Sequence, residues 1–414
     1  GPAVLLEQIE DRFALLRDGP VDLPSRQRTL DATLAWSCGL LSDEQLALFQ
    51  GLAVFAGGAE PDALRAVLGD TVAASADALV DQHLAYWSEQ DGRRRLVQLE
   101  TMRSYARVLL AECHEADALR HAHARHYADL ALAERLRRPH GLEQVDLARR
   151  LEREQANLHQ ALRTALTMDD PEVALSICIG MGTHWFTHGP TEQAISWIEQ
   201  SLERARGRTT DAFAWTALWG AALAWQRGDV ERVARFEADA AATWSLLGSE
   251  AGMARLMHSR SQRLALEGAL DQALPMHRAN LETFRRFRDL EGIVFSRVSV
   301  AYALERMARL DEALIELETA LTEARTHDDL FLQAYVLARL PGVWLDQSSL
   351  ARAESAAAEA ERIDLLVGDR LALPWVAIVR CWVAWERGRY ADAYREARLA
   401  LGLFREVGDE RNEL

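Results

Sequence analysis

The segment Gly228-Asp-Val-Glu-Arg-Val233 decides the fold, because a small residue followed five positions later by Ala or Val returns every 40 residues. The later copies are Gly268/Ala273, Ala308/Ala313, Ser348/Ala353 and Gly388/Ala393, and an earlier copy, Gly189/Ala194, is offset by one residue. A fixed period of this size is typical of stacked helical hairpins, none of which can bury its apolar face alone. The sequence therefore predicts an α-solenoid.

Within each predicted repeat, the first small residue marks a tight turn between two helices. The second lies early in the following helix and lets the two backbones come close together. Twelve residues after the turn, the seam of small residues continues at Ala240, Ala320, Ala360 and Ala400. This spacing resembles the tetratricopeptide repeat, whose common period is about 34 residues. The longer period here predicts longer helices.

Composition and charge argue against several classes of function. The chain has 414 residues and contains no lysine, so its 47 basic residues are all arginine. A Walker A loop and a Schiff base both need lysine. The net charge of −16 argues against nucleic acid as a partner, since phosphate binding needs a basic surface. No apolar run reaches the ~18 residues of a membrane span and no signal peptide is recognised, which predicts a cytoplasmic protein.

Neither the cysteines nor the histidines form a convincing metal-ligand set. Four cysteines lie far apart without a CxxC pair, and we interpret them as small buried hydrophobic residues: Cys38, Cys113, Cys178 and Cys381. A histidine-rich run, His121-Ala-His123-Ala-Arg-His126, lacks acidic or cysteine partners and is flanked by arginine. We interpret it as part of an exposed linking helix, with metal binding as the weaker alternative.

The first quarter of the chain predicts helices followed by a hairpin and a closing helix. Helical patterns cover residues 3–17 and 29–41, and shorter ones cover 62–68 and 76–82. Between them, Ser42 and Gln45 form a capping box that predicts the start of a third helix. Strand-like runs at 84–87 and 95–99 flank Gln90-Asp-Gly92, and a helix follows at 100–112. This order predicts a winged helix-turn-helix, an architecture that does not by itself imply DNA binding.

Two features of this region have alternative interpretations. Gly57-Gly58 could form a phosphate loop, but the pair follows a helix, and we expect it to cap that helix. The run Arg93-Arg94-Arg95 could contact DNA phosphates, but in an acidic chain a solvated hairpin tip or a domain contact is favoured.

Specific residues of this region resemble bacterial STAND-type regulatory ATPases, in the segment that follows their nucleotide-binding module. The resemblance rests on Pro24-Ser-Arg-Gln-Arg-Thr-Leu-Asp-Ala-Thr-Leu-Ala-Trp-Ser37, Leu52-Ala-Val-Phe-Ala-Gly-Gly58, Leu79-Val-Asp81, Leu99-Glu-Thr-Met-Arg103, Arg125-His-Tyr127 and Leu151-Glu-Arg-Glu-Gln-Ala-Asn-Leu158. It continues into the repeats and covers most of the chain.

The resemblance implies a fixed order of domains with separate roles. In such proteins an ATPase that binds ATP or ADP precedes the winged helix, sensor repeats follow it, and a transcription-factor or cyclase output is attached elsewhere. We therefore expect a fragment without the ATPase, with a helical segment at 3–23, a winged helix at 24–110, a helical linker at 111–168 and about six repeats at 169–414. Gly1-Pro2 resembles a tag scar, in keeping with a fragment.

One position departs from the pattern of the family. Many relatives carry a Met-His-Asp motif whose histidine contacts ADP, and the matching positions here are Gln98, Leu99 and Glu100. Because Leu99 offers no polar group, nucleotide sensing through this position is not expected.

The first helix of each tetratricopeptide hairpin lines a concave groove, with groove-facing positions thirteen, ten, six and three residues before the turn. Carried over to this chain, these positions hold Trp215, Trp225, Arg255, His258, Gln262, Phe295, Tyr302, Glu305, Tyr335, Trp375, Trp382 and Trp385. Aromatic walls with a few polar groups suit an apolar, peptide or sugar-like ligand. Alternatively, the longer repeat shifts the register and these rings pack between hairpins.

The leading hypothesis is a non-enzymatic sensor that binds an inducer, peptide or protein in this groove and signals through the winged helix to the ATPase. The second hypothesis is a constitutive scaffold that holds a partner or another copy of the chain. Catalysis has little support, because the sequence shows no nucleophile elbow, metal set or acid/base pair. No cofactor is expected in this chain.

Overall fold

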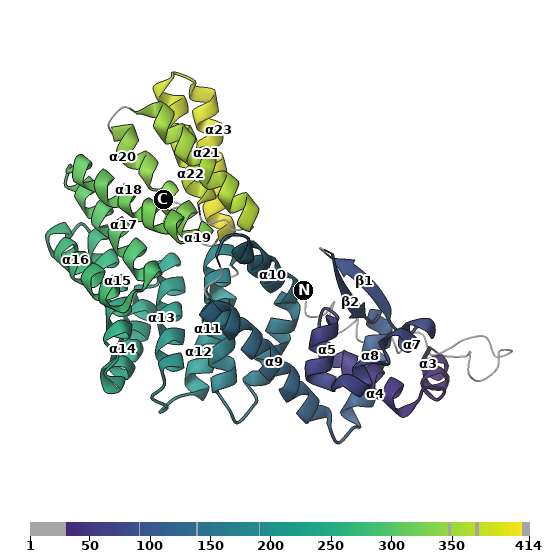
Figure 1. The fold of residues 1–414 in the computed structure, drawn as a ribbon. Helices are drawn as coiled ribbons and strands as arrows, with labels where there is room; N and C mark the ends of the chain where they lie inside the picture. Colours follow the sequence, from purple (N-terminus) through teal and green to yellow (C-terminus); the bar gives the residue numbers. More distant parts are fainter. Residues whose placement is uncertain are drawn as a thin grey trace. The chain divides into compact units, whose positions relative to one another are not determined.

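The computed structural model describes residues 30–90, 92–137, 140–189, 191–346, 349–368 and 372–407, and the predicted helical segment at 3–23 lies outside them. The chain is dominated by helices and divides into two compact units (Figure 1). The first unit extends to Tyr127 and also contains Ala156–Met168, and the second contains Ala128–Gln155 and the chain from Asp169 onward. The predicted linker at 111–168 is therefore shared between the two units.

The first unit has the element order predicted for a winged helix. Its elements are α3 (Leu30–Cys38), α4 (Asp43–Gly51), the 3-10 helix η2 (Leu52–Val54), α5 (Pro61–Leu68), α6 (Asp70–Ala73), α7 (Ala76–Asp81), β1 (Tyr86–Gln90), β2 (Arg93–Val97) and α8 (Glu100–Ala111). The predicted capping box is confirmed, since Gln45 N–H donates to Ser42 Oγ at 3.3 Å and Ser42 N–H donates to Gln45 Oε1 at 3.0 Å. Strands β1 and β2 are antiparallel, with Trp87 opposite Leu96.

Gly57 and Gly58 do not cap a helix, so this prediction is wrong. Helix α4 ends at Gly51 and η2 ends at Val54, and the glycines lie in a loop whose next residue, Ala59, exchanges two backbone hydrogen bonds with Leu96 of β2, at 3.0 and 2.8 Å. The loop stays close to β2 because Gly58 has φ +74° and a Cβ there would lie 2.6 Å from the Leu96 carbonyl oxygen. A side chain at this position would force the loop off the strand.

The arginine run of the hairpin is only partly a solvated tip. Arg95 is buried, and its guanidinium donates to the carbonyl oxygens of Gly57 at 3.2 Å and Gly58 at 2.9 Å. Arg94 lies over the Trp87 ring, 4.4 Å from its centroid. Arg95 thus anchors the glycine loop to the hairpin.

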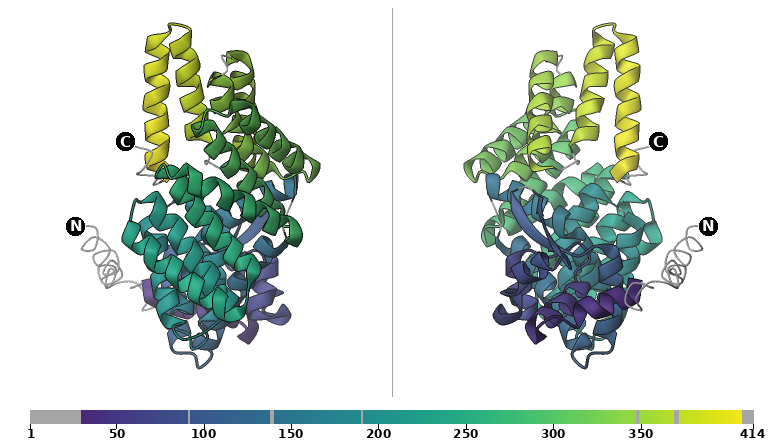
Figure 2. Two further views of the ribbon diagram at one scale, coloured as in Figure 1. Left: turned by 90° about the vertical axis from the view of Figure 1, so that its left-hand side faces the viewer. Right: turned by 90° about the vertical axis from the view of Figure 1, so that its right-hand side faces the viewer.

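Two long helices contribute to both units: α9 (Ala116–Arg137) and α10 (Leu142–Ala165). The remaining helices form consecutive antiparallel pairs in the second unit (Figure 1): α11 (Glu172–His188), α12 (Thr191–Arg204), α13 (Asp211–Gln226), α14 (Val230–Leu247), α15 (Glu250–Leu266), α16 (Leu270–Phe287), α17 (Leu290–Arg306), α18 (Leu310–Thr326), α19 (Leu330–Leu337), α20 (Leu340–Asp346), α21 (Leu350–Val367), α22 (Leu373–Glu386) and α23 (Tyr390–Val407). Both views of Figure 2 show the final pair, α22 and α23, as two long helices that lie side by side.

The predicted turns and seams of small residues are confirmed. The turn residues have left-handed φ angles at Gly189 (+68°), Gly228 (+70°), Gly268 (+88°), Ala308 (+58°) and Gly388 (+71°), whereas Ser348 lies outside the described residues. The second small residue of every copy is buried: Ala194, Val233, Ala273, Ala313, Ala353 and Ala393. The 40-residue period therefore reflects backbone handedness at the turn and close helix packing after it.

A second left-handed position joins each hairpin to the next and also recurs every 40 residues. It falls at Gly248 (φ +63°), Arg288 (+52°), Asp328 (+50°) and Gly368 (+78°). The following helix begins with a side-chain cap at Ser249, Asp289 and Asp329. Arginine and aspartate replace glycine at two of its positions, so a pattern of small residues does not reveal this repeat in the sequence.

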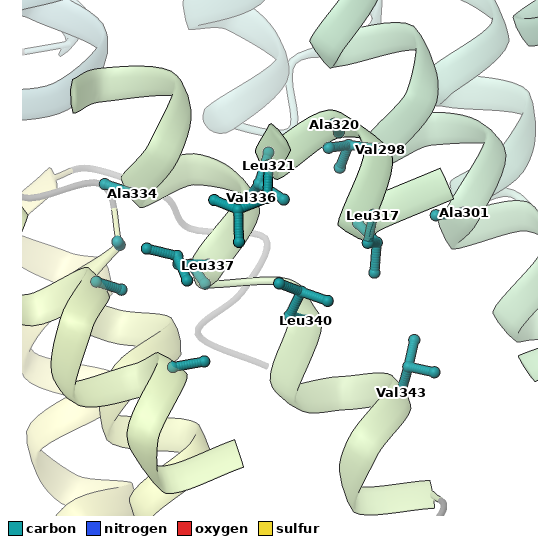
Figure 3. Packing of buried hydrophobic residues seen from close by; sticks show 14 of the residues in the cluster. Val298, Ala301, Leu317, Ala320, Leu321, Ala334, Val336, Leu337, Leu340 and Val343 are labelled. Carbon is teal, nitrogen blue, oxygen red and sulfur yellow. The ribbon is translucent and has the colours of Figure 1, made fainter. Parts of the chain in front are cut away.

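One repeat departs from the pattern because its first helix is broken into α19 and α20. Pro341 lacks a backbone N–H, and its ring would clash with the carbonyl group one turn earlier, which interrupts a helix. Leu340 and Val343 of α20 nevertheless reach the core formed with Val298 and Leu317 (Figure 3). The groove positions predicted by counting back from residue 348 therefore cross a break.

Repeats that are distant in sequence meet within the second unit. His188 Nε2 of α11 lies 2.7 Å from the Gly368 carbonyl oxygen at the end of α21, a hydrogen bond in which the ring donates. The start of α10 also joins the repeats, because the Gln144 Oε1 atom accepts from the Leu330 N–H at 2.7 Å and its Nε2 donates to Asp329 at 2.9 Å. No helix among the residues described above has the length and hydropathy required to cross a bilayer.

Helix packing in the second unit predicts an effect of a single methyl group. Gly292 of α17 lies against the buried Phe284 ring, and a Cβ there would lie 2.4 Å from ring atoms. We expect Gly292→Ala to lower the free energy of unfolding by about 1–2 kcal/mol, because overpacking outweighs the gain in helix propensity. Urea unfolding followed by circular dichroism measures the change.

Gly402→Ala is the matched control, since Gly402 lies in helix α23 and, apart from its own helix backbone, no heavy atom of a described residue lies within 4 Å of the added Cβ. We expect it to leave stability unchanged or raise it by up to about 1 kcal/mol. Equal effects of the two substitutions would contradict the packing argument.

Candidate ligand-binding site

The most spacious of the described cavities, about 190 Å³, opens on the faces of α13, α15 and α17. Successive first helices of the hairpins supply most of its wall, as the predicted groove requires. Its lining residues are Phe186, Trp215, Leu218, Trp219, Ala222, Trp225, Val233, Glu237, Arg255, His258, Ser259, Gln262, Arg263, Glu291 and Phe295. We call this cavity the aromatic pocket.

Six of the twelve predicted groove residues line the aromatic pocket: Trp215, Trp225, Arg255, His258, Gln262 and Phe295. Tyr335 and Trp375 instead line a cavity of only about 10 Å³, where the Arg339 guanidinium lies 4.3 Å from the Trp375 centroid. The structure places the remaining four elsewhere: Tyr302 and Glu305 are half-buried outside both cavities, and Trp382 and Trp385 are 54% and 57% exposed.

Several lining residues were missed, and one of them follows the same rule. Phe186 lies three residues before the turn residue Gly189, so the counting applied to the earliest repeat would have found it. Leu218 and Ala222 also occupy groove positions, but an aliphatic side chain at such a position carries no sequence signal for a ligand site. Glu237 comes from the second helix of its hairpin, whereas the groove positions were counted on first helices only.

The charged residues of the pocket are paired with one another. The Arg255 guanidinium contacts the carboxylates of Asp289 and, at 3.4 Å, Glu291. Glu237 is buried and accepts from Arg263 at 2.9 Å and from Arg260 at 3.2 Å. A buried charge is tolerated only with such partners. These contacts fix the side chains and leave the lining close to electrical neutrality.

Two histidines extend from the pocket wall into the core. The His258 ring stacks on Phe295 with centroids 6.2 Å apart and an interplanar angle of 18°, and the His277 ring is 6.2 Å away on another side. Burial, then the neighbouring His277 and Arg255, lowers the pKa of His258 to about 3. Burial lowers the pKa of His277 to about 4. Both rings are therefore neutral at pH 7.

The histidine-rich run contributes to the core of the first unit. His123 is buried, its ring lies 5.1 Å from the Phe55 ring, and Nε2 lies 3.5 Å from Asn157 Oδ1. The expectation of an exposed helix is therefore wrong at His123. Across residues 30–407, apart from the undescribed gaps, no group of three or more His, Cys, Asp or Glu is arranged to hold a metal ion.

The cysteines follow the prediction in part. Cys38 and Cys178 are buried, and burial raises the pKa of their thiols to about 11 and about 12. Cys113 and Cys381 are half-buried. Leu99, in the position of the family histidine, is exposed and precedes α8 without a side-chain cap.

The chain is similar in sequence to proteins of mycobacteria. No family model matches the chain. A protein from Mycobacterium tuberculosis named "Putative HTH-type transcriptional regulator" is 33% identical over 211 residues, which are 50% of this chain and 24% of that protein, and the Mycobacterium bovis counterpart matches equally. An uncharacterized M. tuberculosis protein is 34% identical over 133 residues, 30% of this chain and 34% of that protein. The chain thus spans about a quarter of the length of the regulators it matches.

Solved structures share the helical solenoid. A Signal Transduction ATPase with Numerous Domains (STAND) protein with a tetratricopeptide repeat sensor, from Pyrococcus horikoshii, superposes with a TM-score of 0.51 at 14% identity, over 94% of this chain and 64% of that one. A Rap protein complexed with Competence and Sporulation Factor gives 0.52 at 11% identity, over 74% and 92%. At these identities the likeness establishes the fold, an α-solenoid of tetratricopeptide type.

The two buried histidines predict a pH dependence of stability. Because they stay neutral in the folded chain but bind protons in the unfolded chain below about pH 6.5, stability falls as the pH drops from 6.5 toward 4. We expect His258→Phe, which keeps the ring but cannot titrate, to lose about 1–2 kcal/mol less than the unmodified chain between pH 7 and pH 5. Urea unfolding at both pH values measures the difference.

The control for this measurement is His327→Phe, which replaces an exposed histidine of the same unit. Its loss of stability between pH 7 and pH 5 should equal that of the unmodified chain. A His258→Phe chain with an unchanged pH dependence would refute the assignment of a neutral buried ring.

Proposed function

We propose that this chain is the sensory and regulatory portion of a STAND-type bacterial transcriptional regulator, and that it binds an inducer in the aromatic pocket. The observation that carries the proposal is the pocket itself, an aromatic cavity of about 190 Å³ with internally paired charges on the first helices of consecutive repeats. The similarity to named regulators and to a repeat sensor of a STAND protein supports it. The chain has no enzymatic role of its own in this proposal.

The geometry of the pocket suits a ligand that gains affinity from ring contacts. Trp215, Trp219, Trp225 and Phe186 provide large apolar surfaces whose side chains lose little entropy on binding. Ligand pockets of proteins typically combine such walls with a few fixed polar groups. Here Gln262, held by a 3.3 Å hydrogen bond to Ser299, and His258 are polar groups of this kind.

Helix α10 offers a route for the signal. Near its start, Gln144 binds the beginning of α19 in the second unit, as described above. Thirteen residues later, Asn157 is fully buried in the first unit, where its Oδ1 accepts from the Ala56 N–H at 2.7 Å and its Nδ2 donates to the Gly58 carbonyl oxygen at 3.0 Å. A continuous helix carries a displacement over these ~20 Å. In this proposal the glycine loop responds when the repeats rearrange.

The winged helix would pass this response to an upstream ATPase module that binds ATP or ADP. Such a relay works only if the inducer prefers one arrangement of the repeats, because a ligand with equal affinity for both arrangements shifts nothing. The proposal therefore requires a difference in affinity between two states of the second unit.

A constitutive scaffold is the second candidate function, and exposed rings favour it. Trp382 and Trp385 on α22 and Tyr390 and Tyr394 on α23 are all more than half exposed, and the Trp385 and Tyr390 rings lie 5.1 Å apart. Surface rings of this kind are enriched where proteins meet. A partner protein, or a second copy of the chain, would bind there without an inducer.

Capture from an extract of the source organism separates the two functions. We expect the unmodified chain to retain a small molecule, identified by mass spectrometry, that Trp225→Ala fails to retain, because Trp225 lines the pocket. The bound compound should also stabilise the fold, by about 2.7 kcal/mol at a hundredfold excess over Kd.

Trp382→Ala is the matched control, since its ring is exposed away from the pocket. It should retain the same compound as the unmodified chain. Loss of a stoichiometric protein partner in Trp382→Ala, with no compound lost in Trp225→Ala, would instead support the scaffold.

The relay predicts a change at a distance. With the captured compound added, amide hydrogen exchange at Ala56, whose N–H binds Asn157, should change at least threefold, whereas Ser88 in the hairpin should not change. An exchange effect confined to the repeats would contradict signalling through α10.

A further inference from the structure

The charges of the aromatic pocket restrict the ligand that it can take. Arg255 and Arg263, the two arginines in the lining, already pair with Asp289 and Glu237, and Glu291 lies beside Arg255. An anionic ligand would have to displace one of these carboxylates from its arginine. A cationic ligand would have to displace an arginine. Either exchange leaves a buried charge without a partner, which strongly disfavours binding of a charged ligand.

The wall of the same pocket also contains a histidine that can form a further hydrogen bond. His258 Nδ1 and His277 Nε2 are inaccessible to solvent, and no other described residue forms a hydrogen bond to either atom. The remaining nitrogen of His277, Nδ1, is taken by Ser261 Oγ at 2.9 Å. Neither His258 Nδ1 nor His277 Nε2 can meet a ligand, because an atom that a water molecule cannot reach is equally closed to a hydroxyl group. The remaining nitrogen of His258, Nε2, is not enclosed in this way, and no other described residue forms a hydrogen bond to it. Of the two histidines, His258 is the one that lines the pocket.

The size and walls of the pocket indicate the rest of the ligand. An apolar cavity of about 150 Å³ accommodates benzene. The aromatic pocket, at about 190 Å³, has room for one or two fused rings. Stacked aromatic pairs gain stability beyond that of the area they bury, and Trp215, Trp225 and Phe295 all line this space.

We infer that the ligand of the aromatic pocket is an uncharged one- or two-ring aromatic molecule with a hydroxyl group that hydrogen-bonds to His258. The inference rests on the proposed function and specifies its inducer. A neutral imidazole has one donor and one acceptor nitrogen, and a hydroxyl group can serve either. The paired arginines hold the walls in place and do not take part in recognition.

Three probes with the same ring system test this inference: 1-naphthol, its methyl ether 1-methoxynaphthalene, and 1-naphthoate. Isothermal titration calorimetry of the purified chain at pH 7 should show 1-naphthol binding at least fivefold more tightly than the ether, which corresponds to about 1 kcal/mol for one hydrogen bond. Naphthoate should bind at least tenfold more weakly than naphthol, because its carboxylate meets neutralised arginines.

His258→Phe identifies the recognising group. It should bind the ether as the unmodified chain does and reduce the advantage of naphthol over the ether to less than twofold. His327→Phe, which changes an exposed histidine, should preserve the fivefold difference. Unchanged binding of the ether also shows that the His258→Phe chain has kept its fold.

The outcomes separate the inference from the proposed function. Tightest binding of naphthoate, equal binding of naphthol and its ether, or no binding of any probe at millimolar concentration would each overturn the inference. A charged compound captured from the extract and lost in Trp225→Ala would also overturn it while supporting the sensor. Capture that does not depend on Trp225 would remove the sensor itself.

Discussion

The close approach of neighbouring helices at small buried residues is the constraint on which the second unit depends. Each hairpin turns at a residue in the left-handed region, such as Ala308 with φ +58°, and then places an alanine or valine against the preceding helix. A larger side chain at that place would push the helices apart and carry the displacement into the next repeat, because protein interiors have little free volume. The spacing of α13, α15 and α17, and with it the width of the aromatic pocket, follows from this seam.

The ion pairs of the pocket are consequences of the same stacking. Arg255 of α15 meets Asp289, which also caps α17, and Glu237 of α14 meets two arginines of α15. Each pair therefore joins one repeat to the next as well as lining the cavity. Burial among rings makes these pairs costly to break, whereas surface ion pairs contribute little. The geometry of the site and the register of the repeats are thus fixed by the same side chains.

Features of the fold that depend on the repeat period or on local spacing can be predicted from the sequence, whereas features that depend on contacts between distant residues cannot. The turns, the seam and the capping box at Ser42 follow from local chemistry, and the structure has them. The burial of His123 depends on Phe55 and Asn157, which come from distant parts of the chain. Among the groove residues outside the aromatic pocket, Tyr335 lies in the helix that breaks before Pro341, and Trp382 and Trp385 lie on the exposed face of α22. A rule of fixed spacing accounts for neither feature.

Helices α9 and α10 each contribute residues to both units. The chain enters the second unit after Tyr127, returns to the first unit after Gln155 and enters the second unit again after Met168. The boundary between the units is therefore not a position in the sequence. Cutting the gene at the codons for residues 110 or 168 would leave one unit with an incomplete core, because Asn157 and Gln144 belong to the same helix but serve different units. A recombination event that exchanges either unit would therefore have to transfer both α9 and α10 with it, because each unit contains residues of both helices.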